Sequence, residues 1–240
     1  MCFSPEMDIA AGLLVTGIGI EGLRHVTSRR QLPLASLPIV FGVHQLTEVP
    51  VWWHLQGKVG QCTGDTAAYV YALIAVILVP ILVPVAFAAL RLGRSRGLDL
   101  AFVVAGLAAA WMLFGILGTE APGRRIDGHQ ITWFAGQHIG DHILPVYAIA
   151  CLGPALLARS RPLQLFGVLN LVVVAALAAL NQGGVVSLWC VWAAITSVLV
   201  NLHLRGVRFG GPGGPPASDD SLHVGQEQFG ERDDLARGGR

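Results

Sequence analysis

Charged residues are scarce in this chain, and lysine is almost absent. Only 13% of the 240 residues are charged, against about 25% in a typical soluble domain. The single lysine is Lys58. Hydrophobic residues make up 53% of the chain, and its mean hydropathy is +0.60. This composition argues against a soluble globular domain, and a net charge of +1 gives no reason to expect nucleic acid as a partner.

Cysteine is also sparse, with four residues in no close spacing. A zinc module built on a C-x-x-C motif is therefore excluded. Cys2 and Cys62 are both expected on the outer side of a membrane, where thiols can be oxidised. The sequence leaves open whether these two cysteines pair or remain free.

Long apolar stretches dominate what remains. A bilayer core of about 30 Å needs about 20 apolar residues per helix, and seven stretches approach that length. We therefore predict an all-α polytopic membrane protein with seven transmembrane helices. The predicted spans lie near residues 7–26, 33–56, 67–90, 98–118, 139–158, 163–181 and 185–204.

The basic residues between these spans fall mostly on one side. Ten arginines lie in the loops of one side, and only Lys58, Arg124 and Arg125 lie on the other. Because cytoplasmic loops are enriched in lysine and arginine, the first side is predicted to be cytoplasmic. The N-terminus is then outside, the C-terminus is in the cytoplasm, and the bacterial cytoplasmic membrane is the expected location.

The end of the chain differs from the rest. Residues 1–205 are predicted to form the membrane bundle. Residues 206–240 are rich in glycine, proline and acidic side chains, and they cannot bury enough apolar surface to offset the entropy of ordering. A disordered cytoplasmic tail is expected there.

The second predicted helix carries polar residues at membrane depth. His44 and Glu48 are four residues apart and share a face, which Trp52 extends toward the outer surface, and Gln45 lies one position around. An unpaired carboxylate at this depth costs several kcal/mol. Glu48 should therefore be protonated, paired or coordinating an ion, or it could serve structure alone as a neutral hydrogen-bonded acid.

Two more helices place polar residues in the same outer layer. His138 and His142, four residues apart, could chelate a metal ion, with Asp141 orienting a ring or adding an oxygen ligand. In the seventh helix, Trp189 fits an interfacial aromatic belt, and Cys190 is a possible ligand or a small core residue. The sequence does not establish whether these helices are neighbours.

We favour the hypothesis that an outer-leaflet polar pocket centred on Glu48 binds or conducts a small ligand, an ion or a proton. Gln45 and His44 would be its polar partners, and Trp52 and Trp189 would form its walls beside Cys190. Whether the protein is an enzyme, its oligomeric state and the identity of its ligand stay open.

Two alternatives involve a metal. A metal-dependent membrane hydrolase, similar in outline to seven-helix ceramidase-type enzymes, would hold zinc with His138, Asp141 and His142 and use Glu48 as the general base. The sequence lacks the third histidine of that arrangement. A redox protein would instead hold copper or haem iron through Cys2, Cys190 and histidines. Retinal is excluded, because the only lysine lies in a loop and cannot form the required Schiff base.

Four motifs connect the chain to a known family. They are Met1-Cys-Phe-Ser, the segment Leu32 to Glu48, Val51-Trp-Trp and Ser187-Leu-Trp-Cys. Together they resemble an uncharacterised family of small multi-pass bacterial membrane proteins that begin Met-Cys-Phe-Ser. The resemblance covers residues 1–205. It implies a multi-pass membrane protein and lends no activity, because none is established for that family.

The resemblance also bears on the candidate residues. The family pattern is matched here by Gln45, Glu48, Trp52, Trp189 and Cys190. Its position 44 can be histidine or glutamine, which weakens a metal role for His44. The His138–His142 pair is not part of the pattern.

Overall fold

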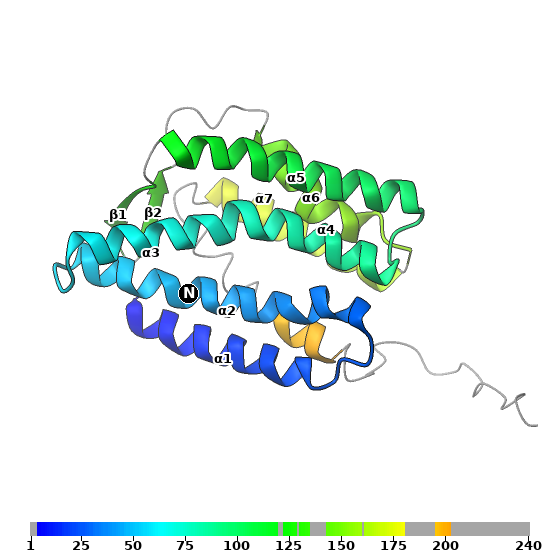
Figure 1. The fold of residues 1–240 in the computed structure, drawn as a ribbon, viewed down its shortest axis with the longest axis horizontal. Coiled ribbons are helices and arrows are strands. Elements are labelled where there is room, and N and C mark those ends of the chain that lie inside the picture. The colour runs from blue at the N-terminus through cyan, green and yellow to red at the C-terminus, as the bar shows by residue number, and fades with distance from the viewer. Residues whose placement is uncertain are drawn as a thin grey trace, which may run out of the picture. The chain divides into compact units, whose positions relative to one another are not determined.

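The computed structural model describes residues 4–119, 122–128, 130–134, 143–159, 161–180 and 195–202. All of them belong to one compact unit, Met1–Val207, so the predicted tail lies outside the described residues. The described chain is mostly helical (Figure 1), and the predicted helical class is confirmed in that form. Residues 195–202 are also helical. The named helices are α1 (Pro5–Leu23), α2 (Leu32–Leu55), α3 (Gln61–Leu73), α4 (Val79–Leu90), α5 (Arg96–Thr119), α6 (Ile143–Leu156) and α7 (Arg161–Leu180).

Three of the described helical stretches are long and apolar enough to cross a membrane. They are Arg29–Leu55, Gln61–Leu90 and Arg96–Gly118. Helix α5 also exposes a stripe of large apolar side chains at helical spacing, which includes Leu100, Val104, Leu107 and Trp111, the last of them 79% exposed. An apolar face of this extent suits contact with lipid rather than water.

Helices α1 and α2 pack against each other very closely. Gly12 of α1 faces Leu46 of α2, and Gly19 faces Ile39, so the two helices run antiparallel. A Cβ atom added at Gly12 would lie 2.7 Å from Leu46 Cγ, and one added at Gly19 would lie 2.8 Å from the backbone nitrogen of Ile39. Small residues are what permit backbones to approach this closely.

The helical stretch that holds α3 and α4 contains a deformation before Pro80. It begins at Gln61, six residues before the predicted span, and a π-helical turn at Ile74–Leu78 joins the two helices. In the π pattern the carbonyl of Ala75 would accept from residue 80, which is proline and has no N–H. The hydroxyl of Tyr147 on α6 donates to that carbonyl at 2.8 Å. The carbonyl oxygen of Ala75 therefore finds its hydrogen-bond donor on a neighbouring helix. A free backbone carbonyl needs such a partner wherever water is absent.

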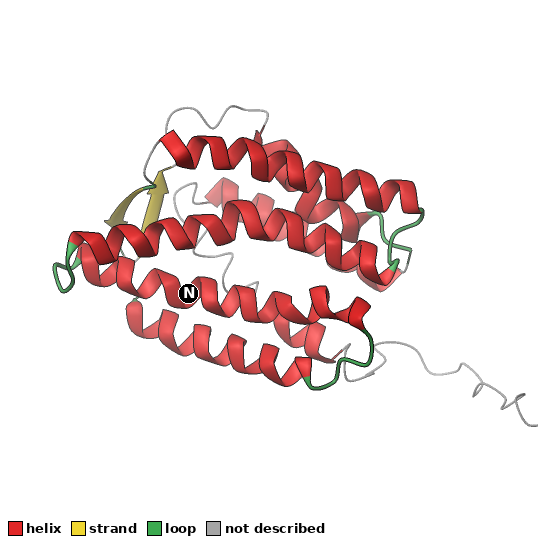
Figure 2. Cartoon of the chain, in the orientation of Figure 1, coloured by secondary structure: helices red, strands yellow, loops and turns green. Residues whose placement is uncertain are grey.

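A β-hairpin interrupts the helical pattern in the segment predicted to be a loop between the fourth and fifth spans. Strands β1 (Gly123–Asp127) and β2 (Gln130–Phe134), yellow in Figure 2, pair antiparallel. In their register Asp127 lies opposite Gln130. The turn begins at Gly128, whose φ of +62° is a conformation that glycine adopts without strain. Ile131 of β2 is fully buried against Val51, Trp52 and Ala68. The hairpin therefore packs on the C-terminal part of α2 and the middle of α3.

Candidate functional site

Helix α2 turns the predicted polar residues into the protein. His44, Gln45 and Trp52 are all buried, and the exposed fraction of Glu48 is 0%. Glu48 therefore points into neither lipid nor solvent. The face predicted from the spacing of these residues is the face that packs against the rest of the unit.

The carboxyl group of Glu48 is covered by the hairpin. Trp133, on β2, donates its indole N–H to Glu48 Oε1 at 3.3 Å. Trp133 alternates with Thr132 along the strand and lies on the same side as Ile131, the residue that anchors β2 in the core. The strand thus fixes the indole above the carboxyl group.

Three aromatic rings form a continuous stack beside this contact. The ring of Tyr71, on α3, lies 3.9 Å from the ring of His44 and 4.3 Å from the ring of Trp133, centroid to centroid. The interplanar angles are 24° and 6°, so all three rings are nearly parallel. The stack joins α2, α3 and β2 and fixes both His44 and the donor of Glu48.

A second buried carboxyl group lies on α1. Asp8 is 1% exposed, and its Oδ2 accepts a hydrogen bond from the Trp52 indole at 3.0 Å. The contact follows from the antiparallel packing of the two helices, which brings the start of α1 beside the end of α2. Asp8 and Glu48 are each held by a tryptophan N–H.

An ion pair fastens the hairpin to α3. Arg124 of β1 contacts the carboxylate of Asp65, with the arginine side chain 9% exposed and the aspartate 42% exposed. Arg124 also donates to the carbonyl of Pro122 at 3.3 Å. The ion pair lies nearer the start of α3, whereas the stacked Tyr71 lies near its end, so the pair fixes the hairpin at a point away from the ring stack.

Sequence reasoning missed Asp8, Tyr71 and Trp133. The hairpin was detectable, since Asp127-Gly128 is followed by the alternating Ile131-Thr-Trp, a pattern typical of a hairpin. The hydrogen-bond partners of Glu48 and Trp52 were not detectable from the sequence, because both contacts join residues far apart in the chain.

Several predicted site residues lie outside the described part of the chain. They are Cys2, His138, Asp141, His142, Trp189 and Cys190. Among the residues that are described, no group of three or more histidine, cysteine or acidic side chains is placed to hold a metal ion. Cys62 is a free, exposed thiol.

The described cluster has the chemistry of a buried acid with neutral donors. An indole N–H donates a hydrogen bond to a carbonyl or carboxylate oxygen and adds no charge to the site. Within the described residues, the buried Nδ1 of His44 has no hydrogen-bond partner, so it can accept or donate a further hydrogen bond. Such a cluster can hold a proton or bind a small polar guest.

Comparison with known proteins assigns the chain to a family and indicates no activity. No curated protein and no solved structure matches the chain. A model of a family of unknown function, DUF6629, matches residues 1–211. The match spans the whole of the compact helical unit, including α2 with its buried polar face and the hairpin that covers it. The chain belongs to this family of unknown function.

Proposed function

We propose that the protein crosses the bacterial cytoplasmic membrane seven times, with its N-terminus outside. Three helical stretches of sufficient length, the exposed apolar stripe of α5 and the asymmetry of the arginines support this placement. A reporter active only in the periplasm, fused after Arg208, should be silent. A fusion at Lys58 should be active, and the reverse pattern would contradict the orientation.

Within that frame, we propose that Glu48 is a reversible binding site for a proton or a small cation. Two observations support this proposal. The Glu48 side chain is 0% exposed, and the Trp133 indole donates a hydrogen bond to its Oε1. Ionising an acid in such surroundings costs several kcal/mol, unless a cation shares the site. A proton or a small cation is therefore what the carboxyl group exchanges.

The experiment is a comparison of the wild type with Glu48→Gln, which keeps the shape of the side chain and cannot bind a proton or a cation as a carboxylate does. Thermal unfolding of both proteins is measured over a range of pH and with a panel of monovalent and divalent cations. A ligand that binds only the folded state raises the unfolding temperature. We expect the wild type to respond to pH or to one cation and Glu48→Gln to lose that response. Identical responses of both proteins would refute the proposal.

Asp8→Asn is the matched control for this experiment. It removes the other described carboxyl group that a tryptophan holds, and it retains a carbonyl oxygen for the Trp52 indole. We expect Asp8→Asn to keep the response that Glu48→Gln loses. A loss of the response in Asp8→Asn alone would move the site to α1.

A further inference from the structure

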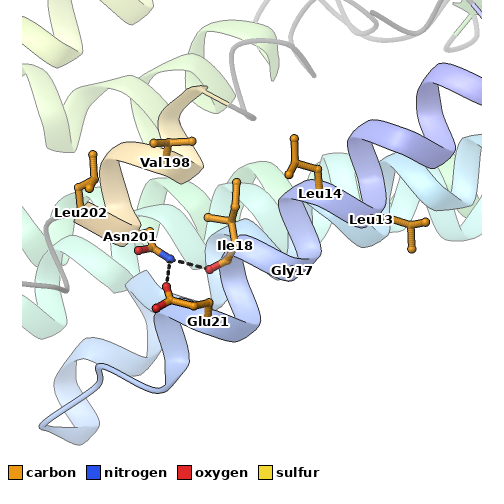
Figure 3. A pocket seen from close by; sticks show the side chains of 8 residues that line it. All are labelled: Leu13, Leu14, Gly17, Ile18, Glu21, Val198, Asn201 and Leu202. Carbon is orange, nitrogen blue, oxygen red and sulfur yellow. Dashed lines mark hydrogen bonds between the residues drawn. The ribbon is translucent and has the colours of Figure 1, made fainter.

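A groove whose lining does not include Glu48 runs along α1 from Leu13 to Glu21, toward the end of the helix that is proposed to be cytoplasmic. It has a volume of about 570 Å³ and lies between α1 and the helical segment 195–202 (Figure 3). Most of its lining is aliphatic, and its polar members are Glu21 and Asn201. The lining residues are Leu13, Leu14, Gly17, Ile18, Glu21, Val198, Asn201 and Leu202.

The polar end of the groove is built by a fixed set of hydrogen bonds. Asn201 Nδ2 donates to the carbonyl of Ile18 at 2.8 Å and to Glu21 Oε2 at 2.6 Å. The other oxygen of Glu21 lies 3.3 Å from His25 Nδ1. Both amide hydrogens of Asn201 are used in these contacts, so the side chains lining this end offer acceptor lone pairs and the negative charge of Glu21. The end is therefore suited to a ligand that donates hydrogen bonds and carries positive charge.

Gly17 lines the apolar part of the groove without a side chain. A Cβ atom added there would meet nothing within 4 Å, so a side chain at this position would project into open space. Leu13 and Leu14, which extend the lining, are 59% and 64% exposed. With α1 in the bilayer as proposed, the medium against these side chains is hydrocarbon.

We propose that this groove binds a single membrane phospholipid with a primary amine in its headgroup. One acyl chain lies over Gly17 against Leu14 and Val198. The ammonium group donates to Glu21 and to the side-chain oxygen of Asn201. Arg24, the exposed C-cap residue of α1 three positions after Glu21, is the cation that we assign to the headgroup phosphate. This inference rests on the membrane placement of α1 and is independent of Glu48.

Native mass spectrometry of the full-length protein tests this inference. The protein is exchanged into micelles with one lipid at a time, either a phosphatidylethanolamine or a phosphatidylcholine of the same acyl chains. The methylated amine of phosphatidylcholine cannot donate a hydrogen bond. We expect one phosphatidylethanolamine to be retained in preference to phosphatidylcholine. Equal retention of the two lipids would overturn the headgroup assignment.

Two variants and a matched control distinguish lipid binding in the groove from nonspecific lipid binding. Gly17→Leu should reduce retention by roughly tenfold, which corresponds to about 1.4 kcal/mol. Gly115→Leu on α5, where an added Cβ also meets nothing, should leave retention unchanged. Glu21→Gln, which still accepts from Asn201, should bind both lipids equally.

Retention by Gly17→Leu equal to that of Gly115→Leu would refute the site. Glu48→Gln should retain the lipid as the wild type does, so failure of the Glu48 proposal and failure of this one give different results.

Discussion

Trp133 donates its indole N–H to the buried carboxyl group of Glu48 across 85 positions of sequence. The donor lies on a short β-hairpin between α5 and α6, and the acceptor lies in the middle of α2. The contact makes the hairpin a structural part of the polar cluster rather than a loop at its edge. Because Trp133 also stacks on Tyr71, the position of one strand controls both the cover of Glu48 and the aromatic stack.

Replacing the donor should destabilise the protein. Trp133→Phe keeps an aromatic ring on Tyr71 and removes the N–H, which leaves a buried oxygen of Glu48 without this hydrogen bond. Such a loss typically costs about 1–3 kcal/mol. Unfolding by denaturant in detergent measures the change in the free energy of unfolding.

The control for this substitution is Trp111→Phe. The side chain of Trp111 is 79% exposed on α5, so its replacement should change the free energy of unfolding little. Equal effects of the two substitutions would show that the Trp133 indole N–H contributes nothing specific.

The ion pair between Arg124 and Asp65 should hold the hairpin against α3. Asp65→Arg should place two like charges together and loosen the hairpin, and so should Arg124→Asp. The double variant, with the charges exchanged, should restore the contact. Hydrogen exchange of residues 123–134 reports the opening of the hairpin. A double variant that exchanges as fast as the two single variants would contradict the pairing.

The close approach of α1 and α2 should be intolerant of added volume. In Gly42→Ala the new Cβ would lie 2.6 Å from the backbone nitrogen of Thr16 and 2.8 Å from the carbonyl oxygen of Gly12. Both neighbours are backbone atoms, so the helices must separate, at a cost of about 1–3 kcal/mol. The measurement is the amount and the melting temperature of folded protein in detergent. Gly115→Ala should match the wild type, and an equally stable Gly42→Ala would show that the α1–α2 contact can relax.

The sequence was sufficient to predict the helical class and the buried face of α2. Hydrophobic length identifies helices, and the spacing of His44, Glu48 and Trp52 already requires a common face. The hairpin was missed because its strands are only five residues long and lie between long apolar segments that dominate the hydropathy.

The partners of the buried groups could not be predicted from the sequence. Asp8 looks like an ordinary acidic residue in the first turn of a helix, where it is favoured by the helix dipole. Its contact with Trp52 depends on the glycines that bring α1 against α2. Tyr71 and Trp133 likewise reach the cluster only through tertiary packing.

The protonation state of Glu48 is the property from which its proposed role follows. Infrared spectroscopy distinguishes a protonated carboxyl group from a carboxylate by its carbonyl stretch. The measurement is the difference spectrum between the wild type and Glu48→Gln, in membranes at neutral pH and without added cations. The corresponding difference spectrum between the wild type and Asp8→Asn identifies the band of Asp8, which is also buried.

We expect the Glu48 difference spectrum to contain a protonated carboxyl band, because burial disfavours the charged form of an acid. Addition of the cation that raises the unfolding temperature should remove this band. A difference spectrum that contains only carboxylate bands in cation-free membranes would show that Glu48 is permanently ionised. That result would contradict its role as a reversible site for a proton or a small cation.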